Sequence, residues 1–342
     1  MKNNLATWDI SEKDYPKNGS QKDKLKFFVK YAILAPSGHN TQPWSFGLDD
    51  EAMVINVYAD RTRALPVIDP DDRELIISCG AAIANLTIAM KYFEYIPEIK
   101  FFPDIADNDL LACIRPLMGY EPAENDKKLF KAIKQRHTNR LPFAEDKIDP
   151  YLLQKLVSVV SEDRITLFVI DNDEKREEVI KLIEQGDRLQ AANKSFCREL
   201  AQWVHPNRKD SKDGIPGYAF GLGDLVSFGT PFFIGNLNWG DIQAGRDRNL
   251  IKGSPVLAVL VSNSYNPLDW LNTGIALEKL LLKAASEGIA ASYLNQPVEI
   301  PELNEQLKNM LNLKGHPNLI IRMGYGKEVK PTPRREVDDV IK

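Results

Sequence analysis

APSGHNTQPW (residues 35–44) carries no formal charge and sets hydroxyl and amide side chains between two prolines. The stretch follows KLKFFVKYAILA (residues 24–35), whose apolar residues recur at helical spacing, so we expect a helix that ends at the first proline. Gly38 lets the backbone approach a ligand closely, and Asn40 and Gln42 offer both hydrogen-bond donors and acceptors. These groups suit the edge of a neutral heterocycle, such as the pyrimidine side of a flavin. The alternative is a turn that satisfies its own backbone groups.

The composition is that of an ordinary globular protein, with 43% hydrophobic and 27% charged residues in a chain of 342. The net charge of −4 argues against a nucleic-acid partner or an anionic membrane surface. The first 20 residues lack the apolar core of a signal peptide, and no uncharged apolar run approaches membrane-spanning length. Three scattered cysteines indicate reduced thiols, so we expect a cytoplasmic protein. The four histidines show no metal-ligand spacing, and we expect no metal site.

The hydrophobic pattern predicts both strands and long helices. Strands are expected at 44–48, 53–60, 110–117, 164–171, 254–263 and 318–326, and helices at 72–95, 129–136, 150–162, 173–193 and 269–288. The helix over 72–95 is apolar almost all round, which predicts that it is buried. The polar stretch 119–128 is interpreted as a joint between two parts of the chain.

Two of the expected helices resemble each other. When 72–95 and 269–288 are aligned on Gly80 and Gly274, Leu86 falls on Leu280 and small residues flank both glycines. A true repeat would make the chain two copies of one α+β unit. The alternative is that two buried helices share a composition.

Two segments concentrate hydrogen-bond donors. RHTNR (136–140) follows the helix expected at 129–136 and suits a phosphate, although cations are also favoured at any helix end. In PTPRREV (331–337) two prolines stiffen the chain before two arginines, and such a preorganised pair suits an anion. The alternative is an ordinary basic tail.

A further segment, SYLNQPVEIP (292–301), again places uncharged amide side chains, Asn295 and Gln296, at the expected end of a strand. The alternative is a turn. The sequence contains no Gly-x-Ser-x-Gly elbow and no Walker A motif, and no pair of catalytic carboxylates stands out. We therefore expect no catalytic side chain, and a cofactor that carries the chemistry.

These motifs together resemble the nitroreductase family. In its signature a helix ends in Ala-Pro-Ser and continues to Asn-x-Gln-Pro-Trp, as in APSGHNTQPW, and RHTNR is similar to its phosphate-binding segment. The C-terminal half is similar throughout, including LNQP, MGYG and PRR. The resemblance implies an α+β nitroreductase-like fold and an FMN site that, in the family, is built from both subunits of a homodimer.

The order of the motifs departs from the family pattern. Here the Pro-Ser motif comes before the only phosphate motif, so each half of the chain lacks what the other contains. This resembles the Acg-type branch, in which two nitroreductase-like halves are fused into a pseudo-dimer with one FMN site. We therefore expect halves at 1–125 and 126–342 and a monomer in solution. The glycine-rich, aperiodic stretch at about 203–250 is expected to be an irregular lid over the flavin, or else an elaborated surface loop.

The resemblance also implies roles for individual residues. Arg136, Thr138, Arg334 and Arg335 are expected at phosphate and ribityl oxygens, and Arg140 near the N1/O2 side of the flavin. Ser37, His39, Asn40 and Gln42 are expected at the ring or ribityl chain, and Leu294, Asn295, Gln296 and Pro297 along the ring near N5. Pro36, Gly38, His137 and Asn139 complete the expected cofactor-binding set, in which the role of His39 is open.

Three functions follow. The first is an FMN-dependent oxidoreductase in which NAD(P)H gives hydride to the flavin and is replaced by a small nitroaromatic or quinone, in ping-pong order. The second is a flavin-sequestering protein with the same site, a covered face and little turnover. The third, a binding protein that has lost FMN, is disfavoured by the intact RHTNR and APSGHNTQPW motifs.

Overall fold

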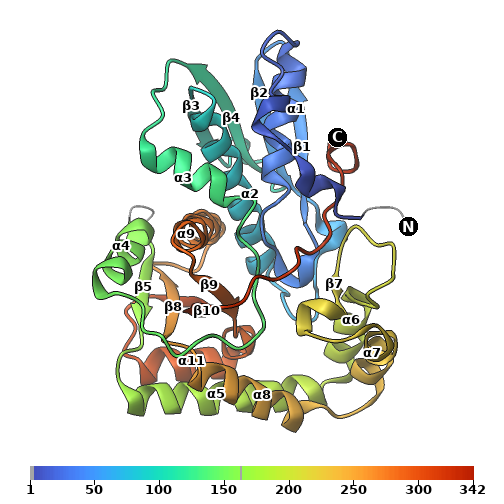
Figure 1. Ribbon diagram of the computed structural model, residues 1–342, viewed down its shortest axis with the longest axis vertical. Helices are drawn as coiled ribbons and strands as arrows, with labels where there is room; N and C mark the ends of the chain where they lie inside the picture. Colours follow the sequence, from blue (N-terminus) through green and yellow to red (C-terminus); the bar gives the residue numbers. More distant parts are fainter. Residues whose placement is uncertain (1–3, 162–163) are drawn as a thin grey trace.

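The computed structural model describes residues 4–161 and 164–342 and contains two four-stranded antiparallel sheets (Figure 1). The first sheet has the order β1-β2-β4-β3, with β1 Trp44–Asp49, β2 Val54–Ala59, β3 Tyr95–Phe101 and β4 Leu110–Met118. The second has the order β5-β8-β10-β9, with β5 Thr166–Val169, β8 Val256–Ser262, β9 Ala290–Tyr293 and β10 His316–Gly324. Together with long helices, these sheets confirm the expected α+β class.

Two long helices, α2 (Arg73–Tyr92) and α9 (Pro267–Ser286), pack against each other between the sheets. Their contact is reciprocal. A Cβ atom on Gly80 would overlap the carbonyl oxygen of Leu271, and a Cβ on Gly274 would overlap that of Ile77. Gly80 faces the carbonyl group of Leu271, three residues before Gly274, and Gly274 faces that of Ile77, three residues before Gly80. Equivalent surfaces meet in this reciprocal way in an isologous interface.

The α2 helix is long and apolar enough to span a membrane by length and composition alone. However, 83% of its most apolar 18-residue window is buried inside the protein. This is the pattern of a core helix, as its all-round apolar character predicts.

The remaining helices outside the insertion pack on the faces and at the ends of the two sheets. They are α1 Gln21–Ala32, α3 Glu124–Ala132, α4 Pro150–Ser161, α5 Asp173–Ala192, α10 Gln296–Glu299 and α11 Pro301–Met310. Phe27, Phe28 and Tyr31 of α1 are almost completely buried and join an aromatic cluster with Phe93 and Phe130. This cluster fixes the end of α1, from which APSGHNTQPW departs.

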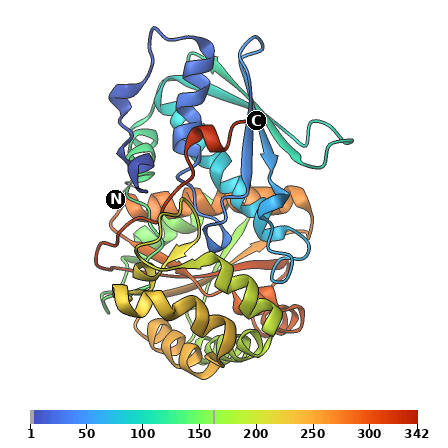
Figure 2. The same cartoon turned by 90° about the vertical axis from the view of Figure 1, so that its right-hand side faces the viewer.

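The insertion is mostly irregular over 204–223, as expected, but it is mostly helical from Asp224 to Lys252, where the expectation of an irregular segment was wrong. It follows α6 Lys194–Trp203 and comprises β6 Val204–His205, β7 Ile215–Pro216, η5 Gly217–Phe220, α7 Asp224–Asn236 and α8 Gly240–Lys252 (Figure 2). No helical period is visible in the sequence because α7 is apolar on its outer side too. Leu225, Phe228 and Phe232 are 94%, 80% and 69% exposed.

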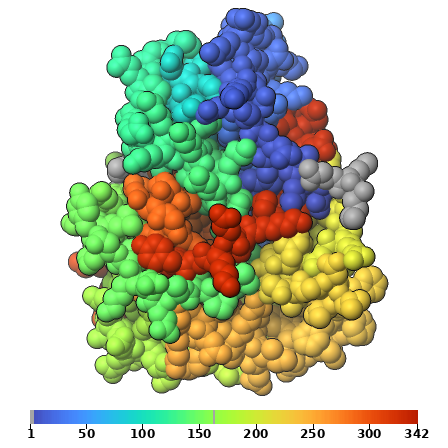
Figure 3. Space-filling model, in the orientation of Figure 1, coloured from blue at the N-terminus to red at the C-terminus, as the bar shows by residue number. Residues whose placement is uncertain are grey.

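The chain after β10 runs back from the second sheet to the first. Figure 3 shows this segment as a band across one face of the molecule. Its last residues add to the edge of β1, where Phe46 N donates to Val340 O at 2.8 Å and Lys342 N donates to Phe46 O at 2.9 Å. The expected half 126–342 therefore ends on the first sheet.

Candidate functional site

The RHTNR segment is held as an extra edge beside the second sheet. Thr138 forms a parallel bridge with Ala291 of β9, and Asn139 N donates to Ala291 O at 2.9 Å. The buried Arg322 of β10 donates to the carbonyl oxygens of Asn139 and Leu141, both at 3.0 Å. The backbone of this segment is therefore fixed before any ligand binds.

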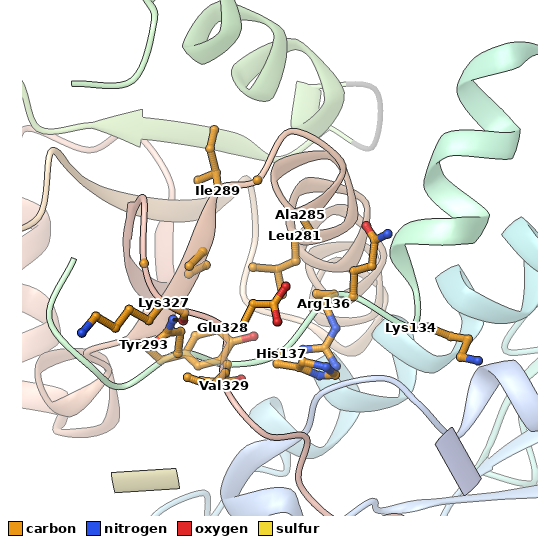
Figure 4. A pocket seen from close by; sticks show the side chains of 17 residues that line it. Lys134, Arg136, His137, Leu281, Ala285, Ile289, Tyr293, Lys327, Glu328 and Val329 are labelled. Atoms are coloured by element: carbon orange, nitrogen blue, oxygen red, sulfur yellow. Dashed lines mark hydrogen bonds between the residues drawn. The ribbon is translucent and has the colours of Figure 1, made fainter. Parts of the chain in front are cut away.

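A cavity of about 480 Å³ opens beside this segment (Figure 4). Of the predicted site residues, Arg136, His137, Thr138 and Asn139 line it. The opposite walls come from the end of α9, from 288–291 and Tyr293, and from 326–329. The other predicted site residues lie outside this lining.

Two arginines that are far apart in the sequence meet at one carbonyl group. Arg136 Nη2 and Arg334 Nη2 donate to the oxygen of Leu34 at 3.0 and 3.2 Å, and both side chains are almost fully buried. Leu34 lies between the end of α1 and Pro36. RHTNR, the C-terminal arginine and the Pro-Ser motif are thus brought together.

The positive charge of these arginines is balanced only in part. Arg136 Nε lies 3.2 Å from Glu278 Oε1, on a fully buried side chain of α9. Burial raises the pKa of Glu278 to about 7, against the opposing effect of Arg136 and Arg334. One carboxyl group near its midpoint at neutral pH faces two guanidinium groups, so an anion is favoured here.

Most polar groups of APSGHNTQPW bond to protein rather than to a cavity. Asn40 Nδ2 donates to Gly214 O at 2.9 Å and to Pro333 O at 3.0 Å, and Asn40 Oδ1 accepts from Arg334. Gln42 Nε2 donates to Lys212 O at 2.9 Å. The amides therefore fasten the insertion and the C-terminal segment to the first half.

Arg335 and Ser37 have similar supporting contacts. Gln42 Oε1 accepts from Arg335 N at 2.8 Å, and Ser37 Oγ accepts from Gln42 N at 2.9 Å. The Arg335 guanidinium donates to the carbonyl oxygens of Gln42 and Asp339. It lies 3.6 Å from Asp60, so it is directed away from Arg136 and Arg334.

His39, Arg140 and Tyr293 form a second polar group. Burial and the Arg140 guanidinium lower the pKa of His39 to about 4, so this imidazole is neutral at pH 7. Burial lowers the pKa of Arg140 to about 10, and its guanidinium lies 5.4 Å from the ring centroid of Phe220. His39 Nδ1 and Tyr293 Oη are buried without a hydrogen-bond partner among the described residues.

The segment 294–297 is anchored to β10 and α5. Asn295 Oδ1 accepts from Ile320 N at 3.0 Å, and Leu294 N donates to Ile320 O at 2.9 Å. Gln296 Nε2 donates to Asp187 Oδ1 at 2.8 Å and to Asp247 Oδ2 at 2.9 Å. Pro297 is buried in the first turn of α10.

Several polar residues near these groups were missed by sequence reasoning. They are Asp187, Asp247, Glu278, Tyr293 and Arg322. For Arg322 a signal existed, because it is a lone charge within the apolar run of a core strand. Glu278 stands beside Lys279 in the sequence, so its burial is not marked in this way. Nothing in the local sequence distinguishes Asp187 or Asp247 from surface residues of α5 and α8.

The model of the Nitroreductase family matches residues 133–325, which is more than half of the chain. The chain belongs to the nitroreductase family. The match begins after α3, so the first sheet lies outside it. The nitroreductase-family fold is thus assigned through the second half.

Relatives of this nitroreductase-family chain match over almost their whole length. The acg protein of Mycobacterium tuberculosis, which is named as an NAD(P)H nitroreductase, is 28% identical over 93% of this chain and 95% of its own. PigM of Serratia, also named as an NAD(P)H nitroreductase, is 24% identical over 93% of each chain. The solved NfnB of Mycobacterium smegmatis, an FMN-dependent nitroreductase in complex with NADPH, is 14% identical with a TM-score of 0.41, over 63% of this chain and 97% of that chain.

Proposed function

We propose that the protein binds one FMN between its two halves and reduces small nitroaromatic or quinone substrates with electrons from NAD(P)H. The observation that carries this proposal is the meeting of Arg136 and Arg334 at Leu34, beside the cavity of about 480 Å³. The names of acg and PigM support the same reaction class.

The residues present suit FMN chemically. Arg136 and Arg334 supply buried cationic donors and Thr138 a hydroxyl, the groups that a phosphate prefers. The unpaired buried atoms His39 Nδ1 and Tyr293 Oη can bond to the edge of a heterocycle. FMN, when bound, would accept and donate hydride. The protein's part is to hold the cofactor, orient the substrate and limit water.

The roles proposed for the site residues follow from their contacts. We assign Arg136, Arg334 and Thr138 to the phosphate end, and His39, Arg140 and Tyr293 to the ring. Ser37, Asn40 and Gln42 act chiefly by holding the backbone of the Pro-Ser motif against the C-terminal segment. We also place the protein in the cytoplasm, because its three cysteines are unpaired, which suits a reducing compartment.

The purified protein is expected to be a yellow monomer that carries one FMN per chain. The reciprocal contact of α2 and α9 already supplies, within one chain, the kind of interface that two subunits would share. Visible absorbance against protein concentration gives the stoichiometry, and light scattering gives the mass. Two FMN per chain would contradict a single site. A dimer that persists in Phe228→Ser, which disrupts the exposed face of α7, would contradict the internal pseudo-dimer.

The reaction class is tested by stopped-flow reduction of the FMN-loaded protein with NADH and with NADPH. We expect the flavin absorbance to bleach with at least one donor and to return on addition of a quinone or nitroaromatic. A protein that binds FMN but is not reduced by either donor would overturn the oxidoreductase and leave the sequestering function.

Sequestration is favoured by one observation, the position of residues 206–220, which we call the strap. The strap bonds both to the first half of the chain and to the C-terminal segment. Asp213 forms an ion pair with Arg63, and Gly214 N donates to Asn40 O at 3.3 Å. Tyr218 Oη donates to Pro331 O at 2.8 Å. A strap held in this way limits access to the proposed ring site.

Asp213→Ala is expected to speed flavin reduction by NAD(P)H roughly fivefold. The change removes the ion pair with Arg63, between side chains that are about one-fifth exposed, worth about 1 kcal/mol, and so increases the open population by that factor. The hydrogen bond from Ser211 Oγ to Asp213 is also lost, but both of its ends lie within the strap. Asp210→Ala, an exposed neighbour, is the matched control. Equal reduction rates in both variants and the parent, measured by stopped flow, would show that the strap is not a gate.

A further inference from the structure

Two carboxyl groups that play no part in the proposed FMN site meet where the halves join. Glu74 lies in the first turn of α2, and Glu299 is the last residue of α10. Arg73 Nη2 contacts Glu74 Oε1 and also donates to the carbonyl oxygen of Val298, the residue before Glu299, which brings the two carboxyl groups within hydrogen-bonding reach of each other. A hydrogen bond between two carboxyl groups needs a proton on one of them. The pair therefore holds a proton inside the protein.

The surroundings favour that shared proton. Arg73 Nη2 lies 3.1 Å from Glu74 Oε1, and Gln190 Nε2 donates to Glu299 Oε2 at 2.6 Å. Asp69 adds a third carboxyl group, which accepts from Glu74 N at 3.1 Å and Leu75 N at 2.9 Å. Three carboxyl groups thus face one arginine, whose guanidinium also donates to two backbone carbonyl groups. Burial raises the pKa of Glu299 to about 7 and that of Glu74 well above its usual range.

The pair lies next to the Pro-Ser motif. Glu74 Oε2 is 3.4 Å from the place that a Cβ atom would occupy on Gly38. A cavity of about 10 Å³, lined by Gly38, Ser78, Glu74 and Asp69 among others, lies between them. This is about the smallest cavity that can hold one water molecule, and the lining offers the polar partners that a buried water needs. Ser78 Oγ already accepts from Gly38 N at 3.4 Å.

We propose that Glu74 and Glu299 form a proton-donating pair, which protonates the reduced substrate through one water at Gly38. This inference rests on the proposed function. Transfer of a hydride to a quinone adds two electrons and one proton, and leaves an oxyanion on the substrate. The oxyanion takes a proton from the bridging water as a new O–H bond forms. The water takes the shared proton as the carboxyl O–H bond breaks, and the pair is then reprotonated from solvent.

The first test observes the proton itself and needs no FMN. Infrared difference spectra at pH 7 are compared for the parent, Glu299→Gln, Glu74→Gln and the exposed control Glu302→Gln. We expect one carboxylic-acid C=O band to be lost in Glu299→Gln and in Glu74→Gln and retained in Glu302→Gln. In the parent one acid band should weaken as the pH rises through about 7, where Glu299 loses its proton. The shared proton should then persist on Glu74, whose pKa burial raises well above its usual range. Retention of every acid band in both pair variants would overturn the proposal.

The second test separates proton donation from structure. Single-turnover oxidation of the reduced protein by a quinone is expected to slow about 100-fold at pH 7 in Glu299→Gln, the scale of general-acid contributions. FMN affinity and the rate of reduction by NAD(P)H should stay within twofold of the parent. The parent's oxidation rate should fall at the pH where its infrared band of the shared proton is lost, whereas that of Glu299→Gln should show no fall at that pH. Equal oxidation rates and pH profiles would refute the role of the pair. If the parent binds no FMN, the proposed function fails, while the infrared band still reports the shared proton, so the two failures are distinguishable.

Discussion

Arg136→Ala is expected to weaken FMN binding by tenfold to more than a hundredfold. A charge-assisted hydrogen bond to a buried phosphate is worth roughly 1.5–3 kcal/mol, which corresponds to that range of affinity. The loss is expected to be near the upper end, because Arg136 is 4% exposed and Glu278 would then face the phosphate with one arginine fewer. Fluorescence titration of the apoprotein with FMN measures the change.

Arg115→Ala provides a matched control for this experiment. It removes the same charge from an exposed site on β4, where Arg115 lies 3.7 Å from Glu98. Its FMN affinity should equal that of the parent. Arg335→Ala should weaken binding less than Arg136→Ala, because the Arg335 guanidinium already donates to Gln42 O and Asp339 O. Unchanged affinity in Arg136→Ala would remove RHTNR from the phosphate site.

Gly274→Ala is expected to lower the free energy of unfolding by about 3 kcal/mol, the upper end of overpacking effects. The added methyl group would overlap the backbone carbonyl of Ile77 and approach Gly80, and neither can rotate away as a side chain can. The two central helices would have to separate to make room. Urea denaturation followed by circular dichroism measures the change.

Gly245→Ala is the control for this substitution. Gly245 lies inside α8 with no atom within 4 Å of an added Cβ, so alanine should raise the free energy of unfolding by about 0.5–1 kcal/mol. A Gly274→Ala protein as stable as Gly245→Ala would mean that α2 and α9 do not pack as closely as described.

The parts of the fold that local pattern determines could be predicted. The buried α2 helix and strand β8 were recognisable because their residues are apolar on every side. The α7 helix was not, because its exposed apolar residues remove the periodicity on which such predictions depend. A helical period in the sequence arises when one face of a helix is buried and apolar and the other is exposed and polar. In α7 the exposed face is apolar too, so no period is visible.

The site was predictable to the extent that motifs mark it. RHTNR and the consecutive Arg334 and Arg335 were recognised in the sequence. The hydrogen bond from Arg334 to Asn40 was not, because it joins residues 294 positions apart. The Glu74–Glu299 contact likewise depends on how α2 meets α10. Contacts between distant elements leave no local pattern, so the strap, the carboxyl pair and the partner of Arg136 required the structure.

The packing of α2 against α9 has a consequence for how the site responds to dilution. Surfaces on separate subunits associate by mass action, and a site between them is lost as the protein concentration falls. Here both helices belong to one chain, so their association is governed by an effective concentration set by the connecting residues. The site should therefore remain assembled at any protein abundance. Each half is also free to diverge alone, because a substitution in one is not repeated in the other.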